Sequence, residues 1–330
     1  MILQRTMNPI FDPDNHLLNL ARRGRRLPHI VVAVLLSFVF ILLAQLGGGI
    51  PAAIIILALS GLPGGDLSLA DPQAFASQLF PDTALEQVIL LVLTFGPIFL
   101  ILWAWLALFE KRPLWTLGLE RRGGAFKYVR GLVIGLVMFA ASVGVSAGLG
   151  YMALETGNPG EQGLAALGGV LFVFLGWTVQ GPAEEAIARG WLLPVIGARY
   201  RPWLGVLVSA LVFTVYHSLN PNLNPVAILN LFLFGLFTAF FALYEGGLWG
   251  VFSIHAVWNW AQGNLFGLEV SGLPAPGGTI FNLMETGPDA ITGGRFGPEG
   301  GLAVTAVLMI STLILLLLFR RKDSGVSHFN

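Results

Sequence analysis

Residues 165–196 read AALGGVLFVFLGWTVQGPAEEAIARGWLLPVI, and this stretch carries the pattern that decides both the fold and the candidate site. Its first part, 165–181, is almost wholly apolar, as expected for a transmembrane helix, which needs about 20 mainly apolar residues. The segment after it carries Glu184, Glu185 and Arg189. An ionisable group inside a membrane costs at least about 2.5–3.5 kcal/mol, so these three residues are candidates for a functional site.

The same apolar pattern recurs along the whole chain. Of its 330 residues, 55% are hydrophobic and only 11% are charged, whereas a soluble domain carries about 25% charged residues. The sequence therefore predicts an all-α, polytopic membrane helix bundle. We expect about eight transmembrane helices, at 29–61, 86–109, 128–152, 165–181 (continuing to about 196), 202–217, 225–243, 247–266 and 301–319. The first run is interrupted by Gly47, Gly48, Gly49 and Pro51, and it is either one kinked helix or a helix with a re-entrant segment.

The positions of Lys and Arg predict the orientation. Basic residues cluster before the first predicted span and after the second, fourth and eighth, whereas the segments 62–85, 153–164 and 267–300 together contain one Arg. Cytoplasmic loops carry the excess of Lys and Arg, so we expect both termini in the cytoplasm. Residues 1–28 and 320–330 are then cytoplasmic tails that flank a transmembrane domain at 29–319. We expect a multi-pass protein of a prokaryotic inner (plasma) membrane.

Composition also excludes several classes of partner and site. The net charge is zero, which argues against nucleic acid as a partner. The chain has no cysteine, so disulfides, thiolate metal sites and cysteine nucleophiles are absent. The expected surroundings are the lipid bilayer and a membrane-associated protein or peptide.

Two histidines join the acidic pair as ionisable groups in predicted spans. His217 ends one span, and His255 lies in another, four residues before Asn259. Glu185 and Arg189 are also four apart and share a helix face, which leaves Glu184 unpaired. A carboxylate, two imidazoles and an amide suffice to activate water and to stabilise an oxyanion.

Three motifs carry these residues: Glu-Glu-x-x-x-Arg at 184–189, Phe-x-x-x-His at 213–217 and His-x-x-x-Asn at 255–259. In this order, on separate apolar spans, they resemble the motifs of the CPBP family of intramembrane proteases, also called the Abi or type II CAAX-endopeptidase family. The resemblance covers about residues 110–266. It implies a hydrolase, a CAAX-type intramembrane endopeptidase that cleaves a membrane-associated protein or peptide.

The resemblance also implies a role for each motif residue. Glu184 would be the general base with His217 assisting, and His255 and Asn259 would stabilise the oxyanion. The supporting residues would be Glu185, Arg189 and Phe213. The family is often labelled metalloprotease, yet a glutamate-dependent mechanism without metal is also proposed for it. Glu184, His217 and His255 could supply three zinc ligands with an open fourth position, so zinc stays possible, although we favour the metal-free alternative.

Other interpretations compete with this one. The charged cluster could serve helix packing in a non-catalytic scaffold or immunity-type protein. It could also relay protons in a transporter, although we find no inverted repeat. Residues 144–148 (GVSAG) match a nucleophile-elbow pattern, but they lie within an apolar helix, where Gly144 and Gly148, like Gly131 and Gly135, are predicted to allow close helix packing.

Two expectations concern the local structure at the acidic pair. Gly181 and Pro182 predict a helix break or a helix start just before it. The span boundaries place Glu184 in the cytoplasmic half of one span and His217 near the outer end of the next. The motifs can meet only if these positions are level in the membrane.

Overall fold

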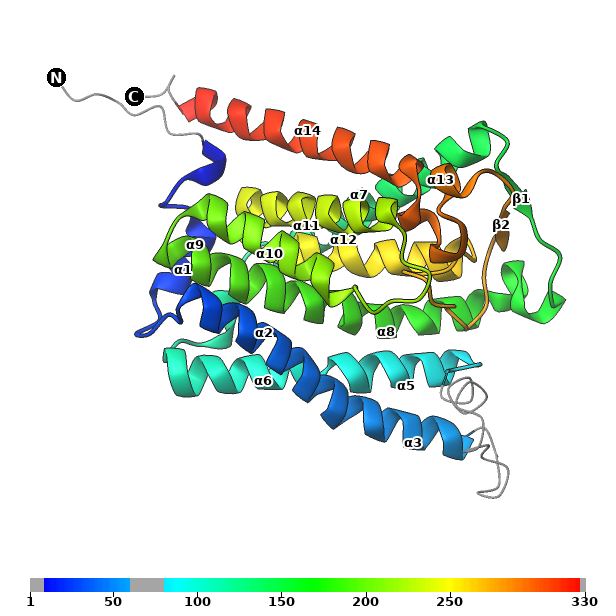
Figure 1. Cartoon of the computed structure of the whole chain (residues 1–330), viewed down its shortest axis with the longest axis horizontal. Helices are drawn as coiled ribbons and strands as arrows, with labels where there is room; N and C mark the ends of the chain where they lie inside the picture. Colours follow the sequence, from blue (N-terminus) through cyan, green and yellow to red (C-terminus); the bar gives the residue numbers. More distant parts are fainter. Residues whose placement is uncertain (1–8, 60–79, 327–330) are drawn as a thin grey trace.

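The protein is described by a computed structural model over residues 9–59 and 80–326, and it forms a single helical bundle (Figure 1). This confirms the all-α membrane bundle predicted from the sequence. The helices are α1 (His16–Arg22), α2 (Ile30–Ala44), α3 (Ile50–Leu59), α5 (Ala84–Phe95), α6 (Pro97–Trp105), α7 (Gly124–Gly148), α8 (Leu167–Glu185), α9 (Leu193–Arg199), α10 (Pro202–Tyr216), α11 (Pro225–Glu245), α12 (Trp249–Trp260), α13 (Asp289–Thr292) and α14 (Leu302–Val326). Two short strands, β1 (Met152–Leu154) and β2 (Leu283–Glu285), pair antiparallel.

Six helical stretches among the described residues are long and apolar enough to cross a membrane: Ile30–Leu59, Ala84–Glu110, Gly124–Gly148, Gly163–Arg199, Pro225–Glu245 and Leu302–Arg321. The other two predicted spans are shorter helices, α10 and α12, and α12 continues as a π-helical segment, Ala261–Leu265.

The first predicted span is one helix rather than a helix with a re-entrant segment. A π-helical segment, Gln45–Gly49, joins α2 to α3 without a break. The end of this predicted span and most of the predicted loop 62–85 lie outside the described residues.

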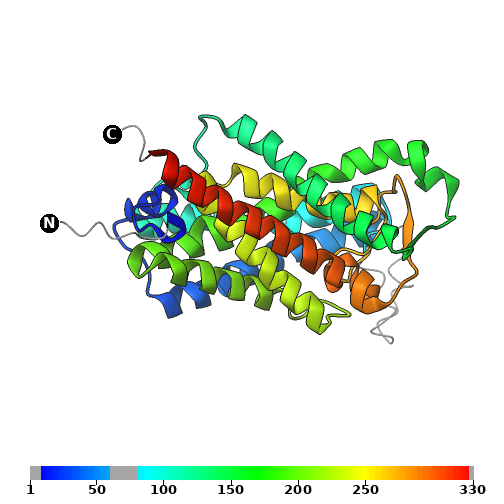
Figure 2. The same cartoon turned by 90° about the horizontal axis from the view of Figure 1, so that it is seen from above.

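The two ends of the bundle differ in what they carry. Both views place α1 and the C-terminal end of α14 at one end, and β1 and β2 at the other (Figures 1 and 2). Within the segment predicted as an N-terminal tail, α1 packs onto the bundle and fully buries Leu17 and Leu18. At the other terminus, α14 continues past the predicted span end at residue 319.

The central helix of the bundle is α12, which packs against α7 and α8. Every residue of Gly250–Asn259 is buried. A Cβ added at Gly131 or Gly135 of α7 would come within 2.4 or 2.7 Å of a backbone oxygen of α12, so the close packing predicted for this pair is present. The same prediction is wrong for Gly144 and Gly148, because no described atom lies within 4 Å of a Cβ there.

The acidic pair lies in an uninterrupted helical stretch. Pro182 is inside α8, so the predicted break at this point is wrong, and α8 continues through a π-helical segment, Ala186–Leu192, into α9. A Cβ at Gly181 would sit 2.9 Å from the backbone nitrogen of Ala256. Gly181 therefore lets α8 approach α12 closely, one turn before the two glutamates.

The helices α9 and α10 form a hairpin that sets the depth of two motif residues. Glu184 precedes the end of α9 at Arg199 by 15 residues, and His217 follows the start of α10 at Pro202 by 15 residues. At about 1.5 Å per residue, both lie about 22 Å from the turn. They are level because the helical stretch that bears Glu184 runs to Arg199, well past the predicted end of the apolar part at residue 181.

A buried polar group supports the π-helical segment after Glu185. The Trp191 indole donates a 2.6 Å hydrogen bond to Glu110 Oε1, and Arg112 Nε donates a 2.6 Å bond to Glu110 Oε2. The side chains of Glu110 and Arg112 are 0% exposed. Because breaking a buried pair is strongly destabilising, this group fixes the segment Ala186–Leu192 against the segment that follows α6.

Candidate active site

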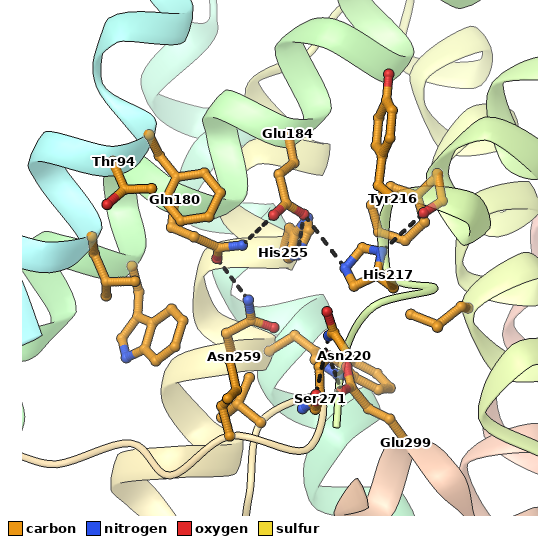
Figure 3. Close-up of a pocket in the computed structure, with 18 of the residues that line it drawn as sticks. Thr94, Gln180, Glu184, Tyr216, His217, Asn220, His255, Asn259, Ser271 and Glu299 are labelled. Atoms are coloured by element: carbon orange, nitrogen blue, oxygen red, sulfur yellow. Dashed lines mark hydrogen bonds and ion pairs between the residues drawn. The ribbon is translucent and has the colours of Figure 1, made fainter. Parts of the chain in front are cut away.

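The residues that the motifs single out surround one cavity of about 320 Å³. Glu184, His217, His255 and Asn259 all line it, and they come from α8, the end of α10 and α12 (Figure 3). The cavity continues to loop residues at the end of the bundle that carries β1 and β2: Phe80, Pro81, Asn220, Ser271, Leu273 and Pro274. The structure therefore brings together motif side chains up to 75 positions apart in the sequence, in a space that extends to the loops at one end.

The Glu184 carboxylate has two differently placed oxygens. Oε1 accepts a 2.8 Å hydrogen bond from Gln180 Nε2. Oε2 is buried and has no hydrogen-bond partner within the described part of the chain. It faces His217 Nε2 at 3.9 Å and His255 Nε2 at 3.8 Å. These separations are too long for direct hydrogen bonds, so one acceptor oxygen and two ring nitrogens converge on a shared space.

The hydrogen bonds of the two histidines fix which ring nitrogen faces Glu184. His217 Nδ1 lies 2.9 Å from the carbonyl oxygen of Phe213, and His255 Nδ1 lies 3.0 Å from Glu185 Oε1. Both partners are pure acceptors, so Nδ1 carries the proton in each ring. In the neutral rings, each Nε2 then presents a lone pair toward Glu184.

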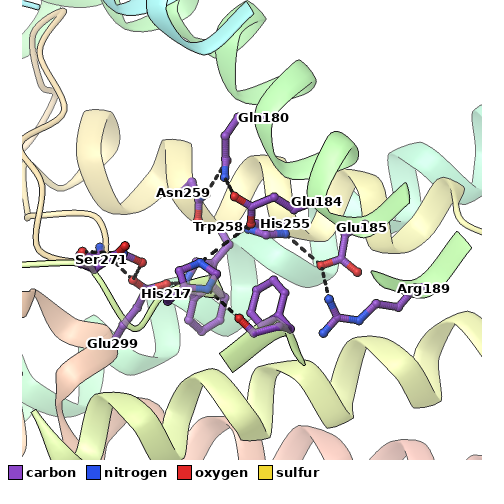
Figure 4. Close-up of polar contacts among 12 residues, drawn as sticks. Gln180, Glu184, Glu185, Arg189, His217, His255, Trp258, Asn259, Ser271 and Glu299 are labelled. Atoms are coloured by element: carbon purple, nitrogen blue, oxygen red, sulfur yellow. Dashed lines mark hydrogen bonds and ion pairs between the residues drawn. The ribbon is translucent and has the colours of Figure 1, made fainter. Parts of the chain in front are cut away.

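Glu185, Arg189 and Phe213 hold the histidines in place. Glu185 Oε1 accepts from Arg189 Nη1 at 3.2 Å as well as from His255, and both members of the ion pair are 0% exposed. The Arg189 guanidinium stacks over the Phe213 ring at 4.3 Å, and the carbonyl of the same Phe213 orients His217. One buried group thus positions both imidazoles (Figure 4).

The charges of this cluster do not balance when both imidazoles are neutral. Glu184 and Glu185 contribute two negative charges, and Arg189 contributes one positive charge. Glu185 is paired with Arg189, so Glu184 is the carboxylate of this cluster that has no Arg or Lys beside it among the described residues.

Sequence reasoning missed Gln180, which links two of the motif residues. Its Nε2 donates to Glu184, and its Oε1 accepts a 2.7 Å hydrogen bond from Asn259 Nδ2. Gln180 is four residues before Glu184 in the same apolar span, so the spacing that pairs Glu185 with Arg189 could have found it.

The residues present do not match a zinc site. A tetrahedral zinc with bonds of about 2.0–2.1 Å brings its ligand atoms about 3.3 Å apart, whereas Glu184 Oε2 lies 3.8 and 3.9 Å from the two imidazole nitrogens. Across residues 9–59 and 80–326, no group of three or more His, Asp or Glu side chains is arranged to hold a metal ion. The metalloprotease label therefore has no support in this geometry.

The fold and site together define a polytopic helical membrane protein with a buried glutamate–histidine centre. Residues 166–261, which contain all three motifs, match a family described as type II CAAX prenyl endopeptidase Rce1-like. This match supports the resemblance to the CPBP family over these residues.

Among curated proteins, the chain is similar to an "Uncharacterized 24.3 kDa protein" of Escherichia coli. The two are 42% identical over 67 residues, which is 20% of this chain and 30% of that relative. The chain therefore matches less than a third of the relative's length. No solved structure matches the chain.

Proposed function

We propose that the protein is an intramembrane endopeptidase that hydrolyses a peptide bond of a membrane-associated protein or peptide. The observation that carries this proposal is the position of Glu184 Oε2, buried without a hydrogen-bond partner among the described residues and within 4 Å of two imidazole nitrogens. It lies in a cavity of about 320 Å³, and peptide hydrolysis needs this combination of a base and room for water. The family match over residues 166–261 supports the reaction class.

The first step is the activation of water. A water molecule at hydrogen-bond distance from Glu184 Oε2 donates one proton to the carboxylate while its oxygen attacks the carbonyl carbon of the scissile bond. His217 Nε2, 3.9 Å from the same oxygen, accepts the second hydrogen bond of that water and orients it. Gln180 holds Oε1, so the carboxylate keeps one orientation during the transfer.

The next step is stabilisation of the oxyanion and departure of the amine. Asn259 uses one amide hydrogen on Gln180 and has a second one for the oxyanion. His255, when protonated on both ring nitrogens, is the second donor at Nε2, and Glu185 accepts from its Nδ1. The proton taken by Glu184 passes to the nitrogen of the leaving amine, which regenerates the carboxylate.

We also propose that the substrate reaches the cavity from the non-cytoplasmic side. The end that carries α1 and the C-terminal end of α14 holds nearly all Lys and Arg of the described residues, which the positive-inside rule assigns to the cytoplasm. The loop residues that line the cavity, such as Pro81 and Pro274, belong to the opposite end.

The test compares membranes that contain the wild-type protein, Glu184→Gln or His217→Ala. New N-termini of membrane proteins are mapped by mass spectrometry. Loss of a general base costs about 10²–10⁴-fold in rate, so we expect new termini with the wild type that are absent with both variants. Glu161→Gln, at an exposed loop position, is the matched control and behaves as wild type. Identical termini in all membranes would reject the protease and favour the scaffold or immunity-type alternative.

The metal-free mechanism has its own test. Purified protein is analysed for bound metal, and peptide hydrolysis is measured with and without a chelator. We expect less than one zinc per ten chains and unchanged rates. Stoichiometric zinc whose removal abolishes hydrolysis would contradict the metal-free step without rejecting the protease.

A further inference from the structure

A second carboxylate lines the cavity across from the motif residues. Glu299 lies in the segment between β2 and α14, and Figure 3 shows it with Ser271 on the side of the cavity opposite Glu184. In Figure 4 both lie beyond His217, on the side away from Arg189. No motif includes Glu299, and the proposed hydrolysis does not use it.

The hydrogen bonds of Glu299 hold its carboxylate in one orientation. Oε1 accepts from the Trp258 indole at 3.1 Å, and Oε2 accepts from the backbone nitrogen of Ser271 at 2.9 Å and from Ser271 Oγ at 2.6 Å. All three donors are neutral. A carboxylate has about four acceptor positions, so these bonds leave one for a further donor.

The negative charge of Glu299 has no counterion in the described part of the chain. Within the described residues, no Lys or Arg forms an ion pair with it, and the cavity lining contains no Lys or Arg. The lining therefore carries two carboxylates, Glu184 among the motif residues and Glu299 in a loop at the end of the bundle that carries β1 and β2.

Other residues at this end of the bundle add to the negative charge of Glu299. The described loops and helix starts at this end contain one base, Arg295, and, besides the partly buried Glu285, seven acids: Asp82, Glu86, Glu155, Glu161, Glu269, Asp289 and Glu299. Walls of one sign of charge attract ligands of the opposite sign and raise their local concentration. A cationic group entering from this end therefore gains attraction outside the cavity and a charged hydrogen-bond partner within it.

From these observations we propose that Glu299 and Ser271 form a subsite for a positively charged group of the substrate, an ammonium or guanidinium, near the scissile bond. The proposal rests on the proposed function, because it names the substrate class of that same cavity. A hydrogen bond to a charged group contributes more than a neutral one, which corresponds to about tenfold or more in affinity.

The test uses three sets of decapeptides built from Ala, Leu and Gly. The first set is acetylated and amidated and contains one Lys, and the second has norleucine in place of that Lys. The third is the norleucine set with a free α-amino group. Binding is measured on the Glu184→Gln protein in lipid nanodiscs, so it does not depend on turnover. We expect the Lys peptides to bind about tenfold more tightly than their norleucine counterparts. If instead only the free α-amino group confers the advantage, the cation is a chain terminus rather than a side chain.

The variants assign the preference to Glu299. Adding Glu299→Gln should remove the preference, whereas Glu269→Gln, an exposed carboxylate at the same end, should keep it. Equal binding of charged and neutral peptides by the protein with Glu299 intact would overturn the proposal, even if Glu299→Gln fails to fold. If the wild type cleaves no peptide, the endopeptidase proposal is rejected, and the binding preference still decides the subsite.

Discussion

Replacing Gly181 with Ala tests whether the approach of α8 to α12 assembles the site. The new Cβ would lie 2.9 Å from the nitrogen of Ala256 and 3.1 Å from the carbonyl carbon of His255, whereas ordinary contacts are 3.4–4 Å. Since both neighbours are backbone or ring atoms of a buried helix, α8 must move away by about 0.5 Å. Glu184 and Glu185 follow on the next turn and move with it.

The expected effect on activity exceeds the effect on stability. A shift of about 0.5 Å lengthens the 3.0 Å bond between His255 Nδ1 and Glu185 to about 3.5 Å, beyond good hydrogen-bond geometry. Overpacking costs about 1–3 kcal/mol, of which the better helix propensity of Ala offsets about 0.5–1 kcal/mol. Misplaced catalytic groups lower rates strongly, so we expect kcat/KM to fall at least tenfold with a modest fall in Tm.

The assay is peptide hydrolysis in nanodiscs together with thermal unfolding in detergent. Gly144→Ala is the matched control, because it adds the same methyl group to an apolar helix where no described atom lies within 4 Å. We expect it to keep full activity and to unfold at the same or a slightly higher temperature. Wild-type kcat/KM in Gly181→Ala would refute the reasoning, because the site would then tolerate separation of the two helices.

Three further predictions follow from other parts of the molecule. The chain has no native cysteine, and Leu219 is 94% exposed. Leu219→Cys should therefore react with an impermeant maleimide outside intact cells, whereas Arg201→Cys should react only after permeabilisation. The reverse pattern would invert the proposed orientation. Burial raises the pKa of Glu285 from 4.5 to about 7, so its protonated form stabilises the folded state at low pH and this stability is lost as the pH rises through 7. At pH 8, Glu285→Gln should therefore raise Tm, with a gain of about 1–2 kcal/mol in the free energy of unfolding after allowance for solvent screening. At pH 4 the substitution should leave Tm unchanged. Equal shifts in Tm at both pH values would contradict this. Arg189→Met leaves Glu185 as a buried unpaired charge and should cost about 3–5 kcal/mol, much of which Glu185→Gln should restore in the double variant; additive losses would exclude the pairing.

The sequence predicts those features that depend on residues close together in the chain. Apolar runs predict most of the spans, and the spacing of four predicts the pairing of Glu185 with Arg189. The π-helical segment after Glu185 was not predictable, because no composition marks it and Pro182 indicates a break instead. The predicted span 202–217 matches α10, but the apolar span before it is predicted to end at 181, which is why Glu184 and His217 did not appear level.

Contacts between distant segments explain the remaining omissions. Glu299 meets Trp258 and Ser271 across 41 and 28 residues; Trp258 occupies a variable position of the third motif, and the other two lie outside all motifs. The loop that contributes Glu299 has no periodic pattern, so only the folded chain reveals that it closes one side of the cavity.

Because α9 and α10 form a hairpin, the number of residues between its turn and Glu184 or His217 sets the depth in the membrane at which the peptide bond would be cleaved. Substitutions along either arm leave the distance from the turn to Glu184 and His217 unchanged. One inserted residue in a single arm would slide its catalytic side chain by about 1.5 Å and swing it by about 100° around the helix. Evolution can therefore vary the composition of these arms, but it can change their lengths only together.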